Sequence, residues 1–303
     1  NVPYYRKIFN QCSFRPESIK DVLEIEKLPL LCKDDIKKNY YDFIDETANP
    51  DDLVYMASGG STGNPLKVLM TKEFRSLNHA STHFYLNVAG FELGASQSIR
   101  LHGNTMPSEV LEKNEFWFEE GNRLTMSVYH VTLENCAAYV DAINSFSPVY
   151  IHAFPSALSL LVEYMCSLKL SFNPSIVAVF CDSETLYDWQ RENISKVTKA
   201  KIFNTYGHTE GATIAITYPN STKLDSIGAI GLVELIGEEG KTLSEKESLG
   251  EIVVTGFNNP VFPLIRYRTY DIATLSLPVD TGRPFVQFES INGRVQDYVV
   301  TKQ

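Results

Sequence analysis

Residues 149–211 read VYIHAFPSALSLLVEYMCSLKLSFNPSIVAVFCDSETLYDWQRENISKVTKAKIFNTYGHTEG, and their pattern of apolar residues indicates the fold class. Its apolar runs have the length of buried strands, and the segments between them show helical periodicity. The predicted strands cover residues 149–152, 176–181 and 201–205. A strand, helix, strand, helix, strand order predicts a parallel sheet with helices packed against it.

The ends of the two helices in this stretch carry local signals. Pro155 suits the first turn of a helix, where its missing N–H costs nothing. Asp182 or Ser183 is placed to cap the second helix, which we expect to reach about residue 198. These signals make residues 150–205 two successive β-α-β crossovers.

The pattern changes on both sides of this stretch. After Gly211, short strand candidates at 213–217, 232–236, 251–255, 272–276 and 285–288 are separated by Gly, Pro and Asn, which predicts an antiparallel or barrel-like subdomain. Upstream, residues 72–88 form an amphipathic helical pattern, and the first 55 residues read as helical and connecting. The predicted fold class is therefore α/β with a small β-rich subdomain.

Composition excludes several classes of protein. The 303 residues carry 27 basic and 37 acidic side chains, a formal net charge of −10, which argues against a nucleic-acid surface. Five scattered cysteines make a zinc ribbon or disulfide framework improbable. Charged residues and a proline interrupt the apolar stretch 149–170, so no membrane partner is expected. We predict a cytoplasmic protein, and a homodimer remains open.

A loop rich in small residues reads SGGSTGNP at 58–65, with Lys67 just beyond. Glycines let the backbone approach a ligand closely, and the hydroxyls add hydrogen-bond donors, as in a phosphate cradle. The spacing is not that of a P-loop, which requires Gly-Lys-Ser/Thr where Asn64 and Pro65 stand. The alternative is a flexible surface loop.

A second polar segment, YGHTEG at 206–211, follows the last strand of the predicted parallel sheet. Ligands bind at the carboxyl ends of such strands. Glu210 offers an oxygen ligand for Mg²⁺ shared with phosphates, and Thr209 and His208 offer donors nearby. On its own, His208 is as well explained by a structural hydrogen bond.

Two further segments combine carboxylates with guanidinium groups: RYRTYD at 266–271 and GRVQD at 293–297. A carboxylate such as Asp271 can accept both hydroxyls of a ribose, and Arg294 can pair with a phosphate. Each segment alone is better explained by a surface ion pair.

In order, these four blocks resemble the adenylate-forming superfamily of acyl-CoA synthetases, peptide-synthetase adenylation domains and luciferases. The stretches VPYYR at 2–6, YIHAFPS at 150–156 and SETL at 183–186 are similar to one branch, which holds phenylacetate–CoA ligases and CapK-like proteins. The resemblance implies a large N-terminal adenylation domain over 1–292, with its β-rich subdomain at about 212–292. Residues 293–303 would form a hinge, with Asp297 as pivot, toward a C-terminal lid that this sequence lacks, so we expect the natural protein to be longer.

The resemblance also implies an ATP site and the role of each residue in it. The phosphate loop comprises Ser58, Gly59, Gly60, Ser61, Thr62, Gly63 and Lys67. The adenine is lined by Ser183, Glu184, Asn204 and Tyr206, with Gly207 and His208 completing the nucleotide contacts. The α-phosphate and Mg²⁺ are held by Thr209 and Glu210, the ribose hydroxyls by Asp271, and the ribose–phosphate edge by Arg294. The catalytic residues are Lys67, Thr209, Glu210 and Arg294.

The implied activity is ATP-dependent conversion of a carboxylic acid to its acyl-AMP, with pyrophosphate released and coenzyme A as the acceptor. Transfer to an amine, or adenylyl transfer in polysaccharide or secondary metabolism, is an alternative, as is a nucleotide-binding homologue without turnover. Two departures from the superfamily bear on this. Asn204 stands where relatives usually have Asp, and Tyr270 where they usually have Gly. A positive φ at position 270 would strain tyrosine by about 1–2 kcal/mol.

Overall fold

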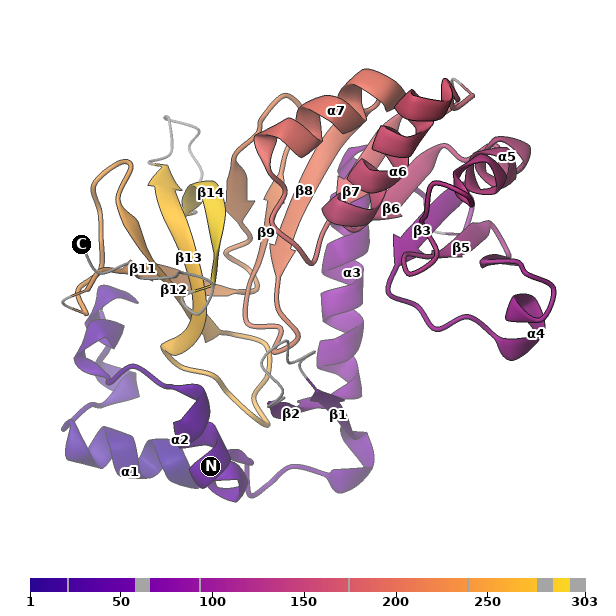
Figure 1. The fold of residues 1–303 in the computed structure, drawn as a ribbon. Coiled ribbons are helices and arrows are strands. Elements are labelled where there is room, and N and C mark those ends of the chain that lie inside the picture. Colours follow the sequence, from indigo (N-terminus) through magenta and orange to yellow (C-terminus); the bar gives the residue numbers. More distant parts are fainter. Residues whose placement is uncertain are drawn as a thin grey trace, which may run out of the picture. The chain divides into compact units, whose positions relative to one another are not determined.

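The computed structural model describes residues 1–20, 22–57, 66–92, 94–173, 175–238, 240–276 and 286–294. Its contacts divide the chain into two compact units (Figure 1). Unit 1 comprises Asn1–Ser81, Gly207–Ala215 and Lys223–Gln303, and unit 2 comprises Thr82–Tyr206 and Ile216–Thr222. Three elements, α3 (Lys72–Val88), β8 (Lys201–Gly207) and β9 (Ile214–Thr217), contribute residues to both.

Unit 2 contains a parallel sheet, as the sequence predicts, but the predicted strands at 149–152, 176–181 and 201–205 are joined there by three strands that the sequence did not predict. Its strands run in the order β8 (Lys201–Gly207), β7 (Ala178–Cys181), β6 (Tyr150–Ala153), β3 (Ser98–His102), β5 (Arg123–Ser127) and β4 (Trp117–Glu120). All pairs are parallel except β4 with β5. The helices of this unit are α4 (Ser108–Leu111), α5 (Cys136–Phe146), α6 (Pro155–Leu168) and α7 (Asp188–Thr198). The predicted α/β class is confirmed.

Side-chain alternation gives the parallel strands two different faces. Ile99, Ile151 and Val179 belong to the apolar core that α5 and α6 complete. The intervening residues Arg100, His152 and Phe180 are directly paired across β3, β6 and β7, so they lie on the opposite face. Polar side chains therefore follow one face of this sheet toward its carboxyl ends.

The second helix of the crossover begins later than expected. Helix α7 starts at Asp188, and its N-cap is Tyr187, whose partner in the capping box is Gln190. Ser183 has a φ of 65°, a left-handed conformation that no first helical turn adopts. The prediction that Asp182 or Ser183 caps this helix is wrong, and residues 183–187 form a connecting loop instead.

Unit 1 contains the β-rich part of the chain. Five antiparallel strands run in the order β11 (Gly231–Ile236), β12 (Leu249–Gly256), β13 (Tyr267–Ser276), β14 (Gln287–Arg294) and β10 (Leu224–Ser226). The sequence did not predict β10, and β13 begins five residues before the predicted 272. A second, two-stranded sheet pairs β1 (Leu53–Ala57) with β2 (Lys67–Thr71).

The N-terminal part of unit 1 is helical, as predicted. It consists of α1 (Pro3–Gln11), η1 (Pro16–Ser18), η2 (Val22–Lys27), α2 (Lys33–Lys38), η3 (Tyr40–Phe43) and η4 (Pro50–Asp52). Within the described ranges, no helix combines the length and hydropathy needed to cross a membrane.

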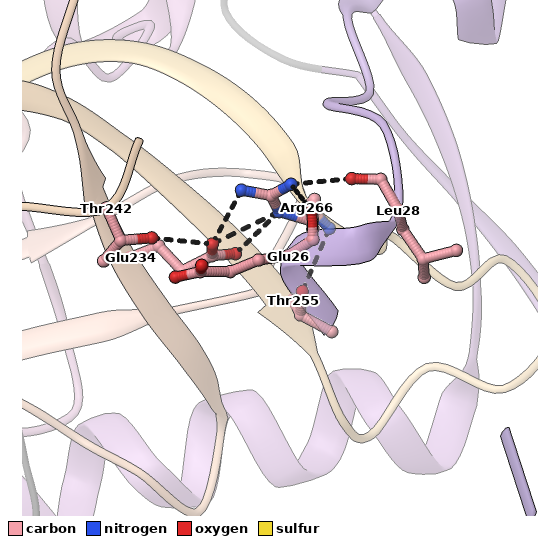
Figure 2. A network of polar contacts seen from close by, with 6 residues as sticks. All are labelled: Glu26, Leu28, Glu234, Thr242, Thr255 and Arg266. Carbon is pink, nitrogen blue, oxygen red and sulfur yellow. Dashed lines mark hydrogen bonds and ion pairs between the residues drawn. The ribbon is translucent and has the colours of Figure 1, made fainter. Parts of the chain in front are cut away.

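A buried ion pair fastens the N-terminal segment to the β-rich sheet (Figure 2). The Arg266 guanidinium contacts the Glu234 carboxylate at 2.9 Å, and each side chain is 5% exposed. Arg266 Nη1 also donates to the backbone carbonyls of Glu26 at 3.0 Å and Leu28 at 2.6 Å. Leu31 then exchanges backbone hydrogen bonds with Arg266 and Arg268, both of 2.9 Å. The start of β13 is thereby fixed to residues 26–31.

Replacing Arg266 with Met should destabilise the protein by about 3–5 kcal/mol, because the buried Glu234 carboxylate loses its counterion. Urea unfolding measures this loss. The double change Arg266→Met with Glu234→Met should be less damaging than the single one, since no charge is left buried alone. Arg6→Met is the control, because its partner Glu46 is 56% exposed and such pairs contribute about 0–1 kcal/mol. An equal loss of stability in Arg266→Met and Arg6→Met would contradict the role given to Arg266.

Candidate functional site

The turn after β8 positions Glu210 in unit 1. His208 Nδ1 lies 3.0 Å from Glu210 Oε2, and the Tyr267 hydroxyl donates to Oε1 at 3.2 Å. Gly211 has a φ of 71°, and a Cβ there would stand 2.6 Å from Asn78 Nδ2. Only glycine fits this position without a shift of its neighbours, so the turn fixes Glu210, which is 8% exposed.

The environment of Glu210 keeps its carboxyl group ionised. Burial raises its pKa, but the hydrogen bond and electrostatic effect of His208, its own backbone amide and the Tyr267 hydroxyl outweigh burial and lower the pKa to about 2. Burial, reinforced by the charge of Glu210, raises the pKa of Tyr267, which therefore remains a donor. These three hydrogen bonds occupy three of the roughly four lone-pair sites of the carboxylate, so one remains for a ligand.

The Glu210 carboxylate is suited to a Mg²⁺ ion that also binds the phosphates of a nucleotide. In the part of the chain that the structure describes, no three His, Cys, Asp or Glu side chains are arranged to hold a metal ion. Magnesium does not need such a cage, because it usually binds one or two carboxylates together with substrate phosphates and waters. Glu210 is a carboxylate of this kind.

A second charged pair lies across β13 and β14 in the same unit. Asp271 and Arg294 are directly paired in the strand register, and Arg294 Nε donates to Asp271 Oδ1 at 3.0 Å. The Asp271 side chain is 9% exposed and that of Arg294 is 47% exposed. The two predicted ribose and phosphate contacts are thus adjacent in space.

Tyr270, next to Asp271, has the positive φ that the sequence comparison suggested. Its φ is 64°, where β13 carries a register shift against β12. The Tyr270 amide donates to Glu251 Oε1 at 3.1 Å, and the Arg268 guanidinium lies 5.1 Å from the centre of its ring. These contacts offset the strain of a non-glycine residue in this conformation.

Unit 2 brings other predicted residues to the carboxyl ends of its strands. The Ser183 hydroxyl donates to Asp182 at 2.7 Å, and Glu184 Oε2 accepts the backbone amide of Ser156 at 3.1 Å. On the next strand, Asn204 is buried, and its amide oxygen has no hydrogen-bond partner among the described residues. An unsatisfied buried acceptor fits a ligand that donates an N–H, such as the exocyclic amine of adenine.

Other predicted site residues are not brought into these groups. Ser58, Gly59, Gly60, Ser61, Thr62 and Gly63 lie outside the described residues, as does the predicted pivot Asp297. Lys67 begins β2 with its side chain exposed, and it makes no side-chain hydrogen bond or ion pair within the described ranges. Thr209 is half-buried in the turn before Glu210.

The sequence reasoning missed several candidates. Tyr267 lies two alternating steps before Asp271 on β13, so strand periodicity was the signal that could have identified it. Lys33 begins α2, and the charges of Glu210 and Arg294 both act on it, although burial is the main cause of its lowered pKa. His102 ends β3, where its Nδ1 lies 3.8 Å from Asp182 Oδ1. No local sequence signal marks either of these two residues.

Glu210 should make stability depend on acid pH. Its folded pKa of about 2 is below the ordinary 4.5, so its contribution is complete above pH 4.5 and is lost as pH falls toward 2. The difference in free energy of unfolding between wild type and Glu210→Gln should narrow by about 2 kcal/mol from about pH 5 to pH 3 in metal-free buffer. Tyr267→Phe should reduce this pH dependence. A difference that stays constant with pH would contradict the assignment.

Comparison with known proteins supports a single family. The sequence profile of AMP-binding enzymes matches residues 9–259. Protein CapK of Staphylococcus aureus is 28% identical over the whole chain, which spans 66% of the length of CapK. The phenylacetate-coenzyme A ligase of Pseudomonas putida is 25% identical, again over the whole chain, which spans 68% of that enzyme.

Solved structures agree on the fold. An open conformation of 2-hydroxyisobutyryl-CoA ligase, in complex with 2-HIB-AMP and CoA, matches 99% of the chain with a TM-score of 0.73. The sequence identity is 16%, and the match covers 72% of that structure. The anthranilate CoA ligase AuaEII, in complex with anthranoyl-AMP, matches with a TM-score of 0.57 at 15% identity.

Proposed function

The chain belongs to the AMP-binding enzyme family, in the branch of CapK and the phenylacetate-coenzyme A ligases, and we propose that it activates a carboxylic acid as its acyl-AMP. ATP is the second substrate, pyrophosphate is released, and coenzyme A is the proposed acceptor of the acyl group. The observation that carries the proposal is the buried, ionised Glu210 carboxylate in the YGHTEG turn. Such a group, kept charged at a cost in desolvation, is suited to a cation that accompanies phosphates.

The first chemical step joins the acid to the nucleotide. A carboxylate oxygen of the acid attacks the α-phosphorus of ATP, and the bond from that phosphorus to the oxygen of pyrophosphate breaks. Glu210 would hold Mg²⁺, and when bound, this ion would neutralise the charge on the phosphate oxygens. Thr209 donates to the α-phosphate, Arg294 contacts the ribose–phosphate edge, and Lys67 contacts the leaving phosphates.

The remaining residues hold the nucleotide in place for this attack. Asp271 accepts the ribose hydroxyls, with Arg294 fixing its orientation from 3.0 Å. Asn204 accepts the adenine amine through its otherwise unsatisfied amide oxygen, and Ser183, Glu184 and Tyr206 line the base. The phosphate loop 58–63, with Gly207 and His208, completes the set. Alignment of the two reactants provides a large part of the rate acceleration.

In the second step, the thiol sulfur of coenzyme A attacks the acyl carbonyl, a thioester forms and AMP leaves. If an amine attacked the acyl carbonyl instead, an amide would form and AMP would leave in the same way. The acyl-AMP is common to both outcomes, so the first step is the one to test.

Exchange of labelled pyrophosphate into ATP should depend on an acid from a panel of aryl, acyl and sugar-derived acids. Glu210→Gln keeps the shape of the side chain but removes its charge, and should slow the exchange roughly 100-fold or more. Calorimetry should show weaker ATP binding by this variant when Mg²⁺ is present. Equal affinities for wild type and variant would contradict the metal role of Glu210. If no acid supports exchange although ATP binds, the chain is a nucleotide-binding protein without turnover.

Asp271→Ala should weaken ATP, ADP and AMP by similar factors, because all three share the ribose. The loss of two hydrogen bonds to a charged acceptor should cost about 3 kcal/mol, or roughly 100-fold in affinity. The control is Glu289→Ala on the neighbouring strand β14, where Glu289 pairs with Lys223 at 3.0 Å. A loss confined to ATP would instead assign Asp271 to the phosphates or the metal.

A further inference from the structure

His102 is a buried side chain that the proposed roles leave without a function. It ends β3, and its side chain is 8% exposed. Nε2 is buried and has no hydrogen-bond partner among the described residues. An unsatisfied buried ring nitrogen is costly, and in a native protein it requires an explanation.

The position of His102 in the sheet points to a ligand. His102 is the last residue of β3, and by the register of β3, β6 and β7 it lies on the same sheet face as Arg100, His152 and Phe180. This is the carboxyl end of the parallel strands, where such sheets bind their substrates. The loop that follows β7 carries Ser183 and Glu184, proposed above to line the adenine.

The neighbours of His102 fix its hydrogen-bonding character. Nδ1 lies 3.8 Å from Asp182 Oδ1, so the carboxylate favours a proton on that nitrogen. Burial is the main cause that lowers the pKa of His102, so the ring is neutral near pH 7. With the proton on Nδ1, Nε2 is an acceptor. Its missing partner is therefore a donor.

An aromatic neighbour packs against the His102 ring. Phe154 packs against His102 with ring centres 4.6 Å apart. The next residue, Gly103, has no Cβ, and a Cβ there would stand 3.1 Å from the Tyr129 hydroxyl. The exposed Tyr129 side chain therefore lies close to the backbone just after His102.

We propose that His102 is a specificity-determining residue whose Nε2 accepts a hydrogen bond from a hydroxyl or amino group on the carboxylic acid. The inference rests on the proposed function, because it assigns the acid to the same sheet edge as the adenine residues. It names a substrate class: acids that carry an O–H or N–H donor in the acyl part. An acid lacking this donor would leave Nε2 unsatisfied in the bound state.

Acyl-sulfamoyl adenosines, in which a sulfamate replaces the phosphate of the acyl-AMP, test this by calorimetry without turnover. The series comprises the analogues of phenylacetate and of its 2-, 3- and 4-hydroxy and 4-amino derivatives, and those of butanoate and its 3- and 4-hydroxy derivatives. Wild type should bind at least one substituted analogue about tenfold or more tightly than its unsubstituted parent. If every parent binds as tightly as its derivatives, the inference is wrong.

Two variants test whether His102 causes the preference for analogues that carry a donor. His102→Phe keeps an aromatic ring beside Phe154 but removes the acceptor, and should abolish the preference. His102→Gln restores an acceptor and should retain part of it. His79→Phe, at an exposed position, should bind like wild type. An undiminished preference in a folded His102→Phe protein would assign the recognition to another residue. If wild type binds neither these analogues nor ATP, the proposed function fails rather than the role of His102.

Discussion

The buried pair of Arg266 and Glu234 is the constraint on which the rest of unit 1 depends. Its guanidinium also binds the carbonyls of Glu26 and Leu28, so one side chain joins a helical N-terminal segment to an antiparallel sheet. Arg266 itself has a φ of 51°. Its side-chain and backbone hydrogen bonds hold it in this strained conformation. It directly precedes β13, the strand that carries Tyr267 and Asp271. The geometry of the candidate site therefore depends on a buried charge that is paired with a carboxylate and hydrogen-bonded to two backbone carbonyls.

In the candidate site, Glu210 is likewise a buried charge that its neighbours satisfy. A buried carboxylate is tolerated there because His208 and Tyr267 satisfy it, and they do so without using all its lone pairs. In unit 2 the reverse holds for Asn204 and His102, whose buried acceptor atoms lack partners among the described residues. At these two unsatisfied acceptors, we expect hydrogen-bond donors of a ligand.

Two departures from the superfamily pattern have different structural consequences. Tyr270 occupies a left-handed position where relatives usually have glycine, and contacts with Glu251 and Arg268 hold it there. Asn204 keeps the acceptor that adenine recognition needs, while giving up the negative charge of the usual aspartate. Neither change removes a hydrogen bond that the proposed reaction requires.

Periodicity in the sequence was sufficient to determine the α/β class, helix α3, the start of α6 at Pro155 and the alternation of β6, β7 and β8 with helices, because burial of one face imposes these patterns locally. The sequence also brought Glu210, Asp271 and Arg294 together as candidates, through motif order. Three other features became apparent only in the folded chain: Tyr267 supports Glu210, Ser183 lies in a loop rather than a helix cap, and His102 is buried with an unused acceptor. These facts depend on strand register and on contacts between residues far apart in the chain, which local spacing does not encode.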